Sequence, residues 1–76
     1  QGNAGAQFNL GLMYHKGDGV LQDDVYAHMW GHIAAVNGNE NGSELRDGVA
    51  KRMTASQIEK AQELAREFIR KEYKGC

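Results

Sequence analysis

Two histidines are the residues of this sequence whose type and spacing best fit a reactive site, in this case a metal site. His28 and His32 lie four positions apart and share one face of a predicted helix, which is a spacing that a metal ion can bridge. No glutamate lies between them, and no cysteine or aspartate is placed to complete a ligand set. Because two ligands alone make a weak site, we expect both histidines on a polar helix strip and no metal centre.

The other reactive side chains lack the partners that catalysis needs. The segment Gly17–Gly19 resembles a phosphate loop only superficially, because the preceding strand, the third glycine and the Lys-Ser/Thr pair are missing. No Ser/His/Asp or Cys/His constellation is visible, and the single cysteine, Cys76, is either an exposed thiol or a crosslink between two chains. Three glutamates at helical spacing belong to a solvated outer face: Glu59, Glu63 and Glu67. We therefore expect no enzyme and no cofactor.

Composition narrows the class of protein further. The chain has 76 residues, no proline and 25% charged residues, which fits one small folded domain and excludes a linker or a disordered tail. Its net charge of -1 argues against binding nucleic acid or a membrane surface. Residues 1–42 sum to -3 and residues 43–76 to +2, an asymmetry that solvated helix faces also produce. No apolar run is long enough for membrane insertion.

The pattern predicts a first helix over residues 4–15. Leu10, Met13 and Tyr14 form an apolar stripe at helical spacing, with Ala6 one turn earlier. Gly17 is a natural C-terminal stop because glycine accepts the left-handed conformation. Asp23 can cap a second helix over residues 24–36, which Gly38 then ends.

The second helix is apolar around most of its circumference, so we expect it to be buried on two sides. One face holds Ala27, Trp30, Gly31 and Ala34, and another holds Met29, Ile33 and Val36. Only the strip with the two histidines is polar. This pattern is typical of the middle helix of a layered stack.

Two further helices are predicted after a polar turn at residues 37–42. We expect the third helix to begin at Ser43 and to use Leu45, Val49, Ala50 and Met53. Thr54 and Gln57 form a capping box that begins the fourth helix. That helix buries Ile58, Ala61, Leu64, Ala65, Phe68 and Ile69, and its opposite face is charged.

The first half of the chain resembles a Sel1-like repeat, a relative of the tetratricopeptide repeat. The matching residues are Ala6, Leu10, Gly11 and Tyr14 in the first helix, then Gly17, Gly19, Val20, Gln22 and Asp23 in the turn, then Ala27, Trp30, Ala34, Ala35 and Gly38. Leu21 stands where the family often has proline, and the repeat lacks the cysteines of disulfide-linked members.

The resemblance implies an all-α fold, a fragment of a helix-turn-helix repeat solenoid made of two antiparallel helix pairs. Residues 1–38 would be one repeat and residues 39–76 a C-terminal helical hairpin acting as a cap. Since repeat arrays usually need three or more units, we expect the C-terminal end of a longer, bacterial protein, with Gln1-Gly2 ending the preceding repeat. The sequence does not indicate a subcellular compartment.

The resemblance also implies a non-catalytic scaffold that binds a protein or peptide partner. Phe8 and Leu12 lie off the apolar stripe of the first helix, so we expect them to be exposed unless a preceding repeat or a partner covers them. By the resemblance, the first helices of such repeats line the binding surface, which adds Asn9 and His15. The alternative is a structural end cap without a partner of its own, which would self-associate through the exposed repeat face.

Overall fold

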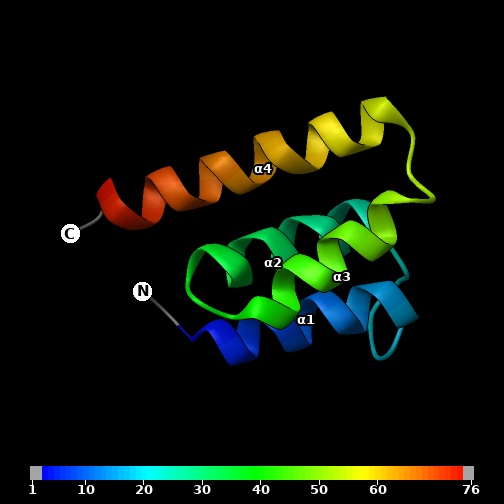
Figure 1. Cartoon of the computed structure of the whole chain (residues 1–76), viewed down its shortest axis with the longest axis horizontal. Helices are drawn as coiled ribbons and strands as arrows, with labels where there is room; N and C mark the ends of the chain where they lie inside the picture. Colours follow the sequence, from blue (N-terminus) through cyan, green and yellow to red (C-terminus); the bar gives the residue numbers. More distant parts are fainter. Residues whose placement is uncertain (1–2, 75–76) are drawn as a thin grey trace.

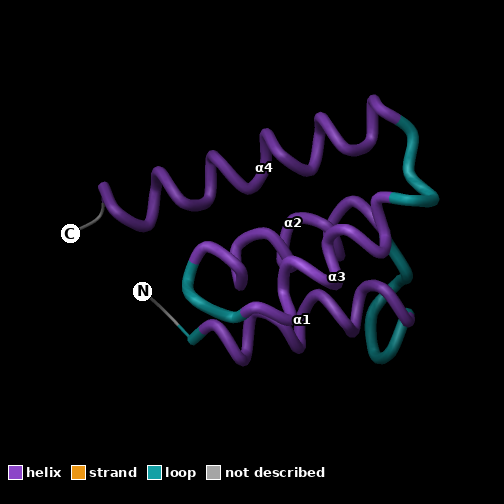
Figure 2. Tube along the Cα trace, viewed as in Figure 1, coloured by secondary structure: helices purple, strands orange, loops and turns teal. Residues whose placement is uncertain are grey.

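The computed structural model describes residues 3–74 and is all-helical over that range (Figure 1). The helices are α1 (Ala4–Lys16), α2 (Asp24–Val36), α3 (Glu40–Ala50) and α4 (Ala55–Lys74). Short turns join them, and the longest connection leads from α1 to α2 (Figure 2). The expectations for Gln1-Gly2 and for Cys76 lie outside the described residues.

The predicted ends of the first two helices are confirmed. Gly17 ends α1 with a φ of 73°, and its N–H donates to the Met13 carbonyl oxygen at 2.7 Å. The Asp23 carboxylate caps α2 by accepting from the N–H groups of Val25 and Tyr26 at 2.9 and 3.3 Å. Interactions within a few residues of Gly17 and Asp23 therefore set the end of α1 and the start of α2.

The prediction for the start of the third helix was wrong. The helix begins at Glu40, because Asn39 is its N-cap and accepts from the Asn41 N–H at 2.9 Å. Gly42, which was assigned to the turn, lies inside α3 and is buried. Ser43 instead donates its hydroxyl to the Glu40 carbonyl oxygen at 2.9 Å.

The capping box at the start of α4 is confirmed and predicts a measurable loss on mutation. The Thr54 hydroxyl accepts from the Gln57 N–H at 3.1 Å, and the Gln57 side-chain oxygen accepts from the Thr54 N–H at 2.9 Å. We expect Thr54→Ala to lower the free energy of unfolding by about 1 kcal/mol in urea titrations. An exposed Ser56→Ala change next to it should have a smaller effect, and equal losses in both variants would contradict the capping role.

Helix α2 is the centre of the fold, as its sequence predicted. Its most extensive interface is with α3, followed by those with α1 and α4. Figure 1 shows α4 along one side of α2, and α1 at the opposite side of the molecule. Ile33 is fully buried, and Trp30 packs edge-to-face on Phe68 of α4 with ring centroids 5.1 Å apart. Both α3 and α4 therefore rest mainly on α2 rather than on each other.

The contact between α2 and α3 depends on two glycines. A Cβ atom on Gly42 would lie 2.5 Å from the Gly31 carbonyl oxygen and 2.8 Å from the Ala35 amide nitrogen. A Cβ atom on Gly31 would lie 2.8 Å from the Gly42 carbonyl oxygen. The two backbones touch directly at this crossing, which no other residue type permits without a shift.

The apolar stripe predicted for the first helix is not its buried face. Gln7 and Gly11 are the buried residues of α1, whereas Met13 is 37% exposed. Gly11 lies against Ala27 of α2 and Leu45 of α3, so the packed face is centred on this glycine. Phe8 and Leu12 are partly covered, by neither a preceding repeat nor a partner. Both are half-buried, because α3 of the same chain lies beside α1.

Candidate protein-binding groove

A groove of about 410 Å³ lies between α1 and α3. Its volume falls in the usual range for ligand-binding clefts, roughly 300–1,000 Å³. Helix α1 supplies one wall and helix α3 the other, and the lining residues are Phe8, Leu12, His15, Asn41, Glu44, Leu45, Gly48 and Val49.

Three of the four candidate residues from the sequence line this groove. Phe8, Leu12 and His15 stand at successive turns of α1 and form one wall. Asn9 is exposed and is not among the lining residues. The structure thus brings together the two apolar residues and the histidine that were singled out, and leaves the asparagine at the surface beside them.

The opposite wall was missed by the sequence analysis. Its residues recur at i, i+3, i+4, i+7 and i+8, namely Asn41, Glu44, Leu45, Gly48 and Val49. This spacing is a helical face and was readable in the sequence. It was missed because the third helix was predicted to begin at Ser43, which placed Asn41 in a turn.

The space beside Gly48 in the groove is open. A Cβ atom built there meets no heavy atom within 4 Å, unlike one built on Gly31 or Gly42. Gly48 lies in the interior of α3, where glycine costs roughly 0.5–1 kcal/mol relative to alanine. Helix packing therefore does not require a glycine at this position.

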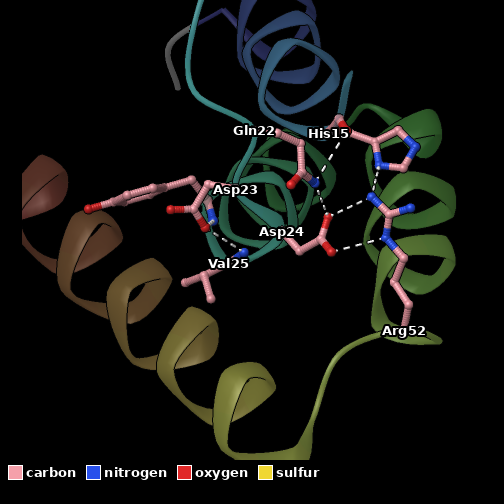
Figure 3. Close-up of polar contacts among 7 residues, drawn as sticks. His15, Gln22, Asp23, Asp24, Val25 and Arg52 are labelled. Carbon is pink, nitrogen blue, oxygen red and sulfur yellow. Dashed lines mark hydrogen bonds and ion pairs between the residues drawn. The ribbon is translucent and has the colours of Figure 1, made fainter. Parts of the chain in front are cut away.

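One end of the groove is fixed by a polar cluster that joins α1, α2 and the turn after α3 (Figure 3). One edge of the Arg52 guanidinium binds the Asp24 carboxylate in a bidentate arrangement, with Nε donating to Oδ2 at 3.0 Å and Nη2 donating to Oδ1 at 2.9 Å. The same Nη2 donates to His15 Nδ1 at 3.3 Å. Gln22 Nε2 donates to Asp24 Oδ1 at 2.8 Å and to the His15 carbonyl oxygen at 3.4 Å.

These contacts hold Asp24 in its charged form. The hydrogen bond and charge of the Arg52 guanidinium lower the pKa of the Asp24 carboxyl, against a smaller opposing effect of burial. Asp24 in turn raises the pKa of Arg52. Because a guanidinium only donates hydrogen bonds, His15 Nδ1 is the acceptor, and the neutral ring carries its proton on Nε2.

The groove carries little formal charge, and that charge is negative. Glu44 is the one lining residue with a formal charge when His15 is neutral, and it is exposed. Among the side chains that the structure describes (residues 3–71), Glu44 takes part in none of the ion pairs, whereas Asp47 on the same helix pairs with Arg46 at 3.0 Å. The groove thus combines an apolar floor with one free carboxylate.

The polar strip that holds the two histidines is not open to solvent. His28 is only 3% exposed, and His32 is half-buried, because α3 packs on this face of α2 through the glycine contact. Arg46 of α3 donates from Nη1 to His32 Nδ1 at 3.1 Å. His28 Nδ1 is buried and has no hydrogen-bond partner among the described residues.

Both histidines resist protonation in this environment. Burial lowers the pKa of His28, and the positive charge of Arg46 lowers it further. The pKa of His32 is lowered by burial and by Arg46 in the same way. Among the described side chains no group of three or more His, Cys, Asp or Glu is arranged to hold a metal ion. The nearest charged neighbour of the pair is a cation, which is unfavourable for a metal.

Comparison with protein-family models, with curated proteins and with solved structures finds no match to this chain. Among the described residues no helix is both long and apolar enough to cross a bilayer.

Proposed function

We propose that this chain is a non-catalytic protein–protein interaction module that binds a peptide segment in the α1–α3 groove. The observation that carries the proposal is the groove itself, with an apolar floor, a polar rim and open space beside Gly48. Clefts of this kind bind ligands because the apolar side chains of a ligand are removed from water when they enter the cleft. A few polar groups of the protein then fix the orientation of the ligand. The resemblance to Sel1-like repeats supports the same function.

The repeat architecture is part of this proposal. Helices α1 and α2 would form one repeat, and α3 and α4 a second antiparallel pair that ends a solenoid. The central position of α2, which contacts all three other helices, supports a stack in which one helix joins two layers. The groove would then lie between the first helices of two successive layers.

The proposal is tested by filling the groove. Gly48→Trp places a large ring in space that is now open, so we expect the chain to fold and to lose its peptide binding. The measurement is a selection of random dodecapeptides displayed on phage against the immobilised wild-type chain and against the variant. Gly48→Ala is the matched control, because it adds one methyl group and should leave binding intact.

We expect peptides to be enriched on the wild-type and Gly48→Ala chains and not on Gly48→Trp. Circular dichroism of all three chains checks that the tryptophan variant is folded. Equal enrichment on the folded tryptophan variant would place the binding site outside the groove and overturn this assignment. A Phe8→Ser, Leu12→Ser double variant, which alters the floor from the α1 side, should reproduce the loss.

The second candidate function is an end cap without a partner, and the outer face of α4 favours it. The exposed residues of this face are almost all charged or polar: Glu59, Lys60, Gln62, Glu63, Arg66, Glu67, Arg70 and Lys71. A polar outer face is what the last helix of a repeat array needs. The peptide selection separates the two functions, because an end cap enriches no peptide on any of the three chains.

A further inference from the structure

The groove carries a specific pattern of charge and hydrogen-bonding groups. Glu44 offers an exposed carboxylate that makes no ion pair with any described side chain. None of the eight lining residues is a lysine or arginine. Arg52, which contacts the lining residue His15, already binds both oxygens of Asp24. A cation is therefore the complementary charge for a ligand in this groove.

The apolar part of the groove lies directly beside this carboxylate. Leu45 follows Glu44 in α3, and Phe8 and Leu12 face it from α1. Val49, one turn further along α3, is fully buried and closes the floor. A ligand that fills this space needs an apolar side chain next to its positive charge.

His15 adds a donor at the far end. Since its Nδ1 accepts from Arg52, the neutral ring has its N–H at Nε2 and can donate to a carbonyl oxygen. Peptide backbones supply such oxygens, and apolar clefts with few polar groups suit short extended or helical segments. The geometry gives the groove an acidic middle and a hydrogen-bond donor at one end.

Resting on the proposed function, we propose that the partner is a short peptide segment with a large apolar side chain next to a lysine or arginine. The apolar side chain would fill the space between Phe8, Leu12 and Leu45. The cation would pair with Glu44, and a backbone carbonyl oxygen would accept from His15 Nε2.

The dodecapeptide selection tests the proposed partner when the enriched peptide sequences are compared between chains that differ in one charge. Glu44→Lys reverses the charge inside the groove. Glu59→Lys is the matched control, because Glu59 is also an exposed helical glutamate that makes no ion pair among the described residues but lies on α4. We expect basic peptides with an apolar neighbour on the wild-type and Glu59→Lys chains, and acidic peptides on Glu44→Lys.

Affinity measurements on one peptide then give the size of the effect. By fluorescence anisotropy, the most enriched wild-type peptide should bind Glu44→Lys about tenfold more weakly and Glu59→Lys equally well, at low salt. Replacing its basic residue by glutamine should remove most of the difference between the two chains. This double comparison assigns the cation to Glu44.

Each other outcome overturns a defined claim. Peptides that are enriched in the groove without a basic residue, or whose charge does not follow the Glu44→Lys change, overturn the partner chemistry and leave the interaction module standing. If the wild-type chain enriches no peptides, or if Gly48→Trp does not remove the enrichment, the proposed function itself is overturned. A further outcome is a wild-type dimer in sedimentation experiments that Gly48→Trp converts to a monomer. That result would show that a second copy of the chain occupies the groove, and it would overturn the proposal of a peptide partner.

Discussion

Gly42→Ala should lower the free energy of unfolding by about 2 kcal/mol. The added methyl group meets backbone atoms of α2 at 2.5 and 2.8 Å, so the two helices have to separate. Overpacking of this kind costs up to about 3 kcal/mol, and the better helix propensity of alanine offsets about 1 kcal/mol of it. For a domain of this length the total stability is roughly 4–11 kcal/mol, so the loss is a large fraction.

Gly48→Ala is the control for this prediction because it makes the same chemical change in the same helix. A Cβ atom on Gly48 meets nothing within 4 Å, so only the gain in helix propensity remains. We expect the free energy of unfolding to rise by roughly 0.5–1 kcal/mol. Urea titrations followed by circular dichroism give both values. Changes of the same sign in the two variants would contradict the direct backbone contact between α2 and α3.

The second large effect is a loss of stability in mild acid. Burial and the Arg46 charge lower the pKa values of His28 and His32 below the ordinary value of 6.5. The unfolded chain then binds more protons than the folded chain as soon as the pH falls below about 6.5. The histidine contribution to stability is therefore complete above that pH and is lost progressively below it. Each proton taken up on unfolding contributes a slope of about 1.4 kcal/mol per pH unit.

The physical reason is the position of the pair between two helices. His32 stands beside His28 on α2, and α3 brings Arg46 and Asp47 to the same place. A proton on His28 Nδ1 would create a buried donor that has no acceptor among the described residues, next to a guanidinium. Acid should therefore loosen α3 from α2. Because α3 is one wall of the groove, peptide binding should weaken over the same pH range.

His28→Leu tests this assignment because leucine fills the site without a titratable group. Urea titrations across the acid range should show a slope reduced by up to about 1.4 kcal/mol per pH unit relative to the wild-type chain. His32→Leu gives the contribution of the second histidine in the same way. An unchanged slope in both variants would assign the acid sensitivity to other groups.

The sequence by itself determined the local structure of this chain. Gly17, Asp23 and the Thr54–Gln57 pair mark helix ends through interactions within a few residues, so each was predictable without knowledge of the fold. The apolar circumference of α2 likewise predicted its central place. Phe8, Leu12 and His15 were singled out from one helix and its resemblance to a repeat, and all three line the groove.

Only the tertiary structure decided which faces meet. The backbone contact of Gly31 and Gly42 draws α3 onto the histidine side of α2, which buries the polar strip in an interface. The same packing places α3 beside α1 and so creates the second wall of the groove. These outcomes depend on pairs of residues that are distant in the chain, for example Arg52 with Asp24, and helical periodicity carries no information on such pairs.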